Sequence, residues 1–393
     1  ELLLADDPQR WIRWLTSEDL PRAGALLRAL GAVDERRACL ALLGEHAANG
    51  RPRPLAIYVI GWAQAHAPEA WAWLWANEDG PLAPAVGLAL PALAPSARSS
   101  ATLTRLLDEG KIDAGALRPI VYGPWIHELE PQVSLELIEV VASRDSRASL
   151  AVELALALVE ADAEPAIHER AVDILACSMV LALEQRLVAA AQVAWERALV
   201  VLMSVGRPKA VTKAIWAAFS VTSGAGSLAM AVRGVRKLIA AGYAEALWTQ
   251  LRTELIANAS SGLIWHLPRV KLLDHLDPDG VLEWVADDAE RGRVIAQLCN
   301  PHGPELGQLE RGLLARFGHE SAVAKELSAR AHSTPRAIIG GLVEFERAQL
   351  AHARAWARDD TLQVRRWAEA LIEQFGRATN DQLARDEFIR KYA

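Results

Sequence analysis

Apolar residues recur throughout this chain with the period of an α-helix. Leu150, Leu154 and Leu158 are spaced four residues apart, and Leu175 and Met179 repeat the spacing. Residues at this spacing lie on one face of a helix, and that face must be buried against another element. Alternation of polar and apolar residues, which is typical of half-buried strands, is nearly absent. The sequence therefore predicts an all-α protein with no sheet.

Prolines and glycines divide this pattern into segments of about 12 to 20 residues. A proline in the first turn of a helix costs no hydrogen bond, because its missing N–H would have had no partner within the helix. We interpret most of these prolines as the starts of new helices and expect about 20 helices. Examples are Pro52, Pro68, Pro131, Pro165, Pro208 and Pro278. Helices of this length joined by short turns predict an irregular α-solenoid of antiparallel helix pairs.

The clearest break in the pattern is the tripeptide Tyr122-Gly123-Pro124. It predicts an N-terminal helical segment over residues 1–122, rich in proline and tryptophan, and a helical array over residues 123–393. The N-terminal segment either continues the array or packs as a separate cap.

Three cysteines, Cys39, Cys177 and Cys299, are far apart and odd in number. They suit a reducing compartment and provide neither a disulfide framework nor a zinc cluster. No apolar run reaches the roughly 18 residues of a membrane span, and no secretory signal is visible. We therefore expect a cytoplasmic protein without a membrane partner. Because the chain begins with Glu1 rather than Met, we also expect it to be a piece of a longer protein.

The segment RDDTLQVRRWAEALIEQF near the C-terminus carries a more specific pattern. Either aspartate can cap a helix in which Val364, Ala368 and Leu371 form the apolar stripe. Asp followed by Val-Arg-x-x-Ala-x-x-Leu resembles the second helix of a HEAT repeat. By this resemblance, Asp360 and Arg365 form polar contacts between successive repeats.

A wider resemblance begins at Leu276 and runs through three segments. These are LDPDGVLEWVADDAERGRVIAQLC, ERGLLARFGHESAVAKELSARAHST and DDTLQVRRWAEALIEQF. They look like the C-terminal region of large bacterial conflict proteins, in which an effector and a STAND or NACHT-type ATPase precede a helical-repeat tail. In that family the tail senses a ligand, often a viral protein, and releases the ATPase to oligomerise. The resemblance implies a sensor or scaffold tail, and it transfers no functional residues.

Motifs that carry chemistry are missing from the sequence. It contains no Gly-x-x-x-x-Gly-Lys-Ser/Thr, no His-Glu-x-x-His and no Gly-x-Ser-x-Gly. His266 and His275 have aspartates nearby, but nine residues is two and a half helical turns and Pro268 interrupts them. We interpret that stretch as a helix end followed by a capping turn rather than a metal site. No catalysis, cofactor or metal is predicted for this chain, and an enzyme with a dispersed site is a third hypothesis.

Charge is strongly segregated along the chain. Its formal net charge is −7, which argues against polyanion binding by the whole surface, yet residues 197–244 contain seven Lys and Arg and no Asp or Glu. If these bases share one face, they can bind a phosphate, a nucleic-acid backbone or an acidic protein patch. The candidate binding residues are Lys209, Lys213, Arg233, Arg236 and Lys237. Alternatively, they pair with the acidic stretch 128–173. The glycine-rich turn at 223–227 could add backbone N–H groups for an anion.

Tryptophan is the other unusual residue, with 14 in the chain. Trp71, Trp73 and Trp75 lie in one short predicted helix, where they spread over about 200° of its circumference. At least one should therefore reach a second surface, either an adjoining repeat or a binding partner. Trp367 is a further candidate for the partner surface, because it lies beside the core-facing stripe of the HEAT-like helix. Tryptophan is enriched where proteins bind one another most tightly.

These observations favour a protein-recognition α-solenoid. The expected partners are a protein ligand, viral if the resemblance holds, and the rest of a longer chain. The alternative is a helical repeat that binds nucleic acid through residues 197–244.

Overall fold

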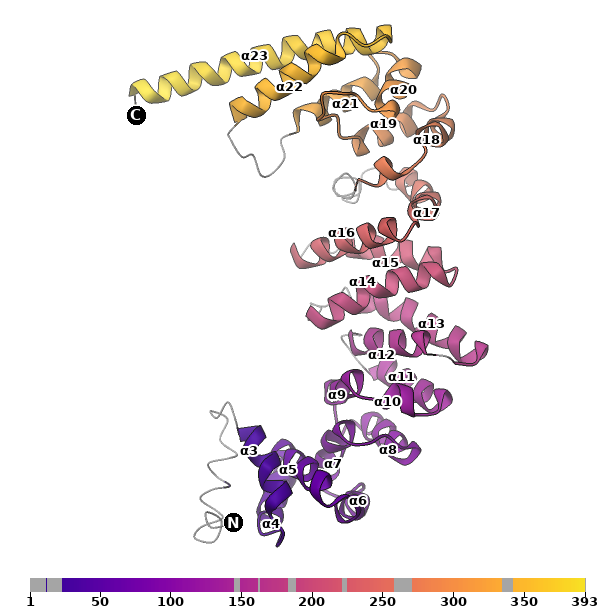
Figure 1. Cartoon of the computed structure of the whole chain (residues 1–393), viewed down its shortest axis with the longest axis vertical. Helices are drawn as coiled ribbons and strands as arrows, with labels where there is room; N and C mark the ends of the chain where they lie inside the picture. The colour runs from indigo at the N-terminus through magenta and orange to yellow at the C-terminus, as the bar shows by residue number, and fades with distance from the viewer. Residues whose placement is uncertain are drawn as a thin grey trace. The chain divides into compact units, whose positions relative to one another are not determined.

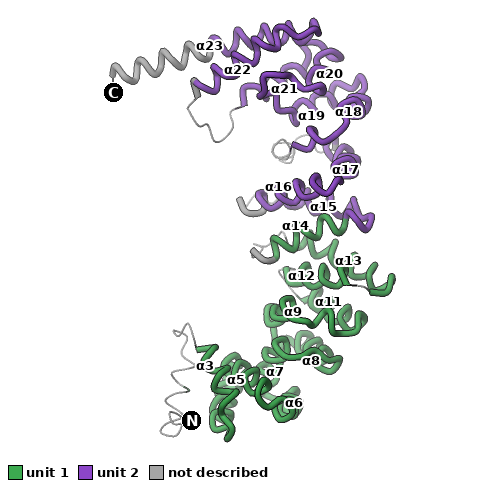
Figure 2. Tube along the Cα trace, in the orientation of Figure 1, with its two compact units in different colours: residues 1–202 green, residues 203–393 purple. Residues whose placement is uncertain are grey.

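The structure is a computed structural model that describes residue 12 and residues 23–144, 149–161, 163–182, 189–220, 225–257, 271–333 and 342–392. These residues form 21 α-helices and no strand, and the helices pack in sequential pairs (Figure 1). The prediction of an all-α helical-repeat arrangement is thus confirmed. The chain divides into two compact units, residues 1–202 and 203–393 (Figure 2).

Unit 1 holds the following described helices: α3 (Ala23–Val33), α4 (Leu40–Ala48), α5 (Pro52–Ala65), α6 (Ala67–Ala76), α7 (Ala83–Ala89), α8 (Ala97–Asp108), α9 (Arg118–Tyr122), α10 (Trp125–Glu128), α11 (Pro131–Arg144), α12 (Ser149–Glu160) and α13 (Pro165–Leu181). α14 (Ala189–Ser204) runs across the boundary between the units. The predicted break at residues 122–124 falls inside unit 1, between α9 and α10, and stays a prediction.

The most extensive helix contact of unit 1 joins α3 and α5. A Cβ atom added to Gly31 would collide with the carbonyl group of Tyr58, and one added to Gly61 would collide with that of Arg28. The two backbones can approach this closely only because glycine has no side chain there.

The turn after α3 is organised by a buried carboxylate. Asp34 is 4% exposed and accepts hydrogen bonds from the backbone N–H groups of Ala38 and Cys39 and from the Tyr58 hydroxyl at 2.8 Å. Burial, together with this carboxylate, raises the pKa of the Cys39 thiol to about 11. Asp34 thus connects the end of α3 to the middle of α5.

The predicted apolar stripe of α12 is buried, with Leu154 and Leu158 fully inaccessible. The same helix also buries Glu153, whose carboxylate lies 3.0 Å from the guanidinium of Arg118 in α9. A buried charge needs such a partner, because losing the partner leaves it unpaired in a poorly polarisable environment.

Unit 2 holds α15 (Pro208–Ser220), α16 (Ala225–Ala240), α17 (Ala244–Ala257), α18 (Pro278–Val285), α19 (Ala289–Leu298), α20 (Gln308–Phe317), α21 (Ala322–His332), α22 (Leu342–Trp356) and α23 (Leu362–Tyr392). Neighbouring helices in sequence are also neighbours in contact, as in α15 with α16 and α22 with α23.

Helix starts in both units follow the expected chemistry. Pro52, Pro165 and Pro278 each occupy the first turn of a helix. Asp277 and Asp288 accept backbone N–H groups at the starts of α18 and α19. Among the described helices, none is long and apolar enough to cross a membrane.

Candidate functional site

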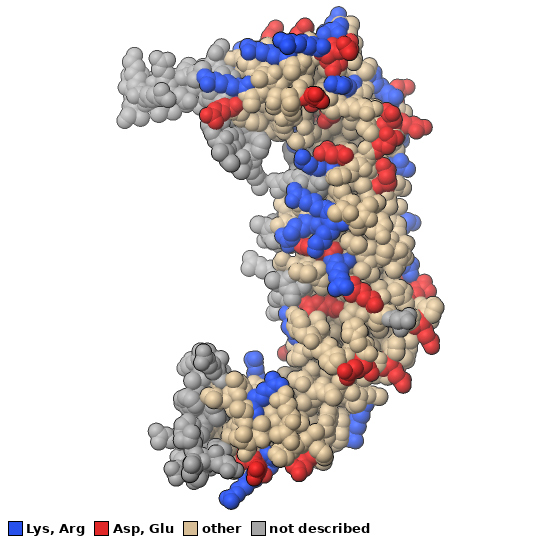
Figure 3. All heavy atoms as spheres, viewed as in Figure 1, with Lys and Arg blue, Asp and Glu red and all other residues tan. Residues whose placement is uncertain are grey.

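The basic residues predicted to bind a partner lie on two adjacent helices of unit 2. Lys209 and Lys213 are exposed on α15, and Arg233, Arg236 and Lys237 are exposed on α16. We call these five residues the basic face. Basic side chains gather over this part of unit 2 in Figure 3. Since α15 and α16 pack together, the bases can act on one partner.

Pairing with the acidic stretch accounts for only part of the basic segment. Arg197 in unit 1 lies 2.6 Å from the carboxylate of Glu160, which belongs to that stretch. Lys209 and Lys213 make no ion pair among the described residues. The glycine-rich turn begins at Ser223 and Gly224, which lie outside the described residues, and Ala225 is the first residue of α16.

The three tryptophans of α6 are all half-buried, and they meet two different neighbours. Trp73 contacts Trp62 of α5, with ring centroids 6.2 Å apart. Trp71 and Trp75 stack on each other at 5.1 Å, with 25° between their planes. The guanidinium of Arg98 lies 4.3 Å from the ring centroid of Trp75. We call Trp71, Trp75 and Arg98 the aromatic stack.

Arg98 in this stack is held in place by its neighbours. Its guanidinium lies 2.7 Å from the carboxylate of Glu78, which also accepts a 2.8 Å hydrogen bond from the hydroxyl of Thr102. Hydrogen bonds from Arg98 and Thr102 outweigh the effect of burial and lower the pKa of Glu78. The stack is therefore pre-ordered, which reduces the entropy lost when a partner binds.

Trp367 does not belong to a partner surface, and that prediction is corrected. It is 2% exposed, stacks on Trp356 at 5.5 Å, and donates its indole N–H to Ser328 at 2.9 Å. Ser328 comes from α21 and Trp356 from α22, so Trp367 joins three helices. Its position beside the apolar stripe places it in the core because two other helices cover that side of α23.

The polar pair taken from the HEAT resemblance has a different geometry. Arg365 donates to the backbone carbonyls of Asp359 and Asp360, both at 2.9 Å, within its own turn. The carboxylate that reaches another helix is that of Asp359, which lies 2.9 Å from the guanidinium of Arg311 in α20. The inter-helix contact is thus made one residue before Asp360.

A buried polar cluster in unit 2 was not foreseen from the sequence. Burial, with the carboxylate of Glu310 nearby, raises the pKa of the Cys299 thiol well above its usual range. Burial lowers the pKa of His302 to about 4, so its ring is neutral near pH 7 and hydrogen-bonds to Gln349. A protonated thiol is a poor nucleophile, so these groups are suited to structure rather than to attack on a substrate.

His275 of the alternative metal site is described, whereas His266 lies outside the described residues. Within the described parts of the chain, no group of three or more His, Cys, Asp or Glu residues could hold a metal ion.

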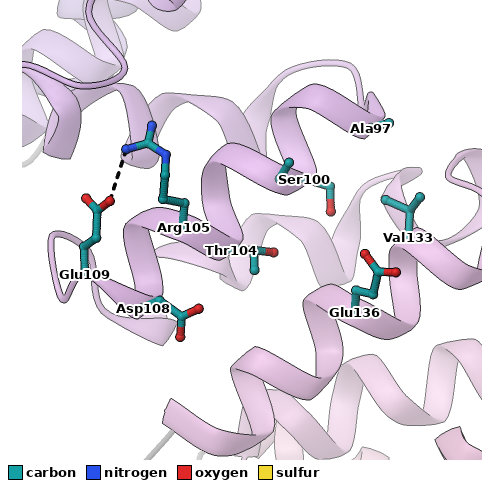
Figure 4. A pocket seen from close by; sticks show the side chains of 9 residues that line it. Ala97, Ser100, Thr104, Arg105, Asp108, Glu109, Val133 and Glu136 are labelled. Atoms are coloured by element: carbon teal, nitrogen blue, oxygen red, sulfur yellow. Dashed lines mark hydrogen bonds and ion pairs between the residues drawn. The ribbon is translucent and has the colours of Figure 1, made fainter.

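A hollow of about 600 Å³ lies between α8 and α11 in unit 1 (Figure 4). Its wall on α8 is made of small side chains, namely Ala97, Ser100, Ala101 and Thr104, and Val133 faces them from α11. Asp108, Glu109, Glu136 and Arg105 lie at its edges. Asp108 lies 3.3 Å from the guanidinium of Arg144 and Glu109 lies 2.7 Å from the ammonium of Lys111, so two of the three carboxylates are paired with bases. Arg105 is itself engaged by Glu109 at 3.4 Å and by Asp79 at 2.8 Å. We call this hollow the α8–α11 groove.

Sequence reasoning missed Arg98, Glu153 and the α8–α11 groove. Each of these features is formed by side chains from helices that are distant in sequence, so the local spacing of residues does not predict it. Comparisons with protein-family models, curated proteins and solved structures find no match for this chain.

Proposed function

We propose that the chain is a protein-recognition array of helix pairs that binds a protein ligand. The observation that supports this most directly is the aromatic stack of unit 1. Tryptophan and arginine are the residues that most often dominate protein–protein binding energies. Here Trp71 and Trp75 are half-buried, stacked and fixed by Arg98, so they offer a rigid, partly accessible aromatic surface.

The finer proposal is that the array is the ligand-sensing or scaffold part of a larger bacterial antiphage protein. Its support is the resemblance of the segment from Leu276 onward to the tails of STAND and NACHT-type ATPases. No reaction is assigned to this chain, and ATPase and effector activities belong to other parts of such proteins.

The test is affinity capture from nuclease-treated lysates of phage-infected and uninfected bacteria, with the captured proteins identified by mass spectrometry. We expect a phage protein that is retained by the wild type and lost with Trp71→Ala/Trp75→Ala. Trp71→Phe/Trp75→Phe keeps flat rings and should retain part of the binding. Tyr122→Ala is the matched control, because it removes an aromatic side chain that is 69% exposed elsewhere in unit 1. Capture that is the same for the wild type and the double alanine variant would contradict the assignment to the stack.

A second candidate function, nucleic-acid binding, is favoured by the basic face. Phosphate contacts release counterions, so binding to duplex DNA or RNA should weaken steeply with salt. Electrophoretic mobility shifts over a salt series test this, with Lys209→Glu/Lys213→Glu as the weakened variant. A flat salt dependence, or equal binding by the variant, would rule it out.

A further inference from the structure

Another hollow of unit 1 lies where α9 and α10 meet the short 3-10 helix η1 (Leu90–Ala92). Its volume is about 500 Å³, within the range of about 300 to 1,000 Å³ that is typical of ligand pockets. Apolar residues make up most of its wall, and three of them are prolines, namely Pro91, Pro119 and Pro124. We call it the α9–α10 hollow.

Contacts within unit 1 hold the walls of this hollow in place. Trp125, which is fully buried, donates its indole N–H to the backbone carbonyl of Leu93 at 3.0 Å. The guanidinium of Arg118 is held by the buried carboxylate of Glu153. Because these groups are fixed before a ligand arrives, binding would order few further side chains and lose little entropy.

Tyr122 is the part of the wall that is most open to solvent. At 69%, it is the most exposed large apolar side chain among the described residues. In the part of the chain that the structure describes, its hydroxyl makes no hydrogen bond and its ring meets no other ring or cation. Tyrosine has only two side-chain torsions, so it offers a large contact area at a low entropic cost when a partner covers it.

The polar side chains that line the hollow can donate hydrogen bonds, and none of them is a carboxylate or an amide. They are the hydroxyl of Tyr122 and the guanidinium of Arg118, which donates to Glu153 and to no other described residue. The backbone carbonyls of Leu93 and Pro124 already accept hydrogen bonds, from an indole N–H and from the first turn of α10. A fitting ligand therefore brings apolar surface and hydrogen-bond acceptors.

Proline-rich segments have this chemistry. Proline has no backbone N–H, and the polyproline II helix leaves every carbonyl free of internal hydrogen bonds. Such segments dock in grooves lined by aromatic side chains, because their stiff conformation loses little entropy on binding. We propose that the α9–α10 hollow binds a proline-rich segment of a partner protein in the polyproline II conformation. Its pyrrolidine rings pack on Tyr122, and its carbonyls accept hydrogen bonds from Tyr122 and Arg118.

The hollow does not select for charge. Arg118 is balanced by Glu153, and no other charged residue lines the wall. Binding should therefore be nearly the same at about 50 mM and about 0.5 M salt, since screening acts on unbalanced charges.

This site extends the proposed function to a second surface and a stated class of ligand, and it is separate from the aromatic stack. Tyr122→Ala should lose the proline-rich ligand and keep the ligand captured through the stack. Trp71→Ala/Trp75→Ala should do the reverse. The failure of either proposal is thus distinguishable from the failure of the other.

The experiment is a titration of dye-labelled decaproline with the whole purified chain, followed by fluorescence anisotropy. The control peptide consists of five Gly-Ser repeats, which have the same length and no charge but carry an N–H group at every residue. The wild type should bind decaproline about tenfold more tightly than the control peptide, or better.

Variants of the wall then locate the site. Tyr122→Ala should weaken decaproline binding about tenfold or more, because the ring is lost. Tyr122→Phe keeps the ring and should weaken it about fivefold, because one hydrogen bond is lost. Ala92→Trp, which places a large ring in the hollow, should abolish binding. Val33→Ala is the matched control, because it shortens an apolar side chain that is 54% exposed elsewhere in unit 1.

Circular dichroism establishes that each variant is folded before it is compared. Absence of decaproline binding by the wild type, or equal binding of the two peptides, would overturn the proposal. Equal binding of decaproline by the wild type and Tyr122→Ala would also overturn it. Binding that disappears at high salt would do the same, because it would assign the contact to a charged surface and not to this hollow.

Discussion

In unit 1, α3 and α5 cross at Gly31 and Gly61, where the absence of side chains lets the two backbones come close. In unit 2, α23 packs on α22 and α21 through the large ring of Trp367, which stacks on Trp356. Both contacts join helices of similar apolar period. One is limited by how close two backbones can come, and the other by how well two large rings fill the space. Adding side-chain volume should therefore destabilise the contact in unit 1, whereas removing side-chain volume should destabilise the contact in unit 2.

The largest effect should come from removing side-chain volume at the α21–α23 contact of unit 2. Trp367→Ala removes a buried ring and its N–H bond to Ser328, so the free energy of unfolding should fall by about 4 kcal/mol. Trp367→Phe keeps most of the volume and should cost less. Hydrogen exchange measured by mass spectrometry should show faster exchange in α21–α23 and little change in α3–α5. Uniform acceleration across both units would contradict the local packing described here.

The next largest effect should come from adding side-chain volume at the α3–α5 contact of unit 1. Gly61→Ala adds one methyl group against the carbonyl of Arg28, which cannot move aside without separating α3 from α5. We expect a loss of about 3 kcal/mol in the free energy of unfolding, measured by urea denaturation. Gly80→Ala is the control, because its Cβ would meet no atom within 4 Å. Equal stability of the two variants would mean that the close crossing does not exist in solution.

The sequence predicted helices, their proline-marked starts and their pairing, because these depend on local spacing and on backbone chemistry. It did not predict how closely the helices approach. Gly31 and Gly61 are poor helix formers, so in the sequence they resemble breaks in the helical pattern. Their role is to allow close packing against a helix some 30 residues away, which the local sequence does not show. Trp367 was misplaced for the same reason, since Ser328 and Trp356 come from other helices.

The candidate binding surfaces were likewise only partly predictable from the sequence. Charge segregation in residues 197–244 is visible in the sequence, and the structure exposes the five bases on two neighbouring helices. The spacing of Trp71 and Trp75 indicates a shared face, and their rings do stack. That Arg98 covers Trp75, and that α8 and α11 enclose a groove, could be known only once distant helices were placed.

Acid should destabilise the two units to different extents, because unit 2 buries a histidine in its polar cluster. Burial lowers the pKa of His302 from 6.5 to about 4, so its stabilising effect is present above pH 6.5 and is lost as the pH falls towards 4. After allowance for partial solvent exposure, the loss should be about 2 kcal/mol. Glu310 and Glu346 have raised pKa values and oppose this trend.

The measurement that isolates His302 is therefore a difference. Urea denaturation from pH 7 to pH 4.5 should show a steeper loss of stability for the wild type than for His302→Asn, which carries no titrating ring. Parallel pH profiles for the two proteins would show that His302 is not buried as described.

The smallest expected effect concerns a helix start in unit 2. Asp288 accepts the backbone N–H groups of Glu290 and Arg291, at 2.9 and 3.1 Å, and so caps α19. Asp288→Ala should lower the free energy of unfolding by about 1 kcal/mol, because two N–H groups lose their acceptor. Asp287→Ala is a matched control, since it removes the same charge from the adjacent exposed residue, which accepts no such bond among the described residues. If both variants lose the same stability, the effect is due to charge alone. If only Asp288→Ala does, unit 2 relies on a local cap at this junction, whereas the corresponding junction in unit 1 after α3 relies on the buried carboxylate of Asp34.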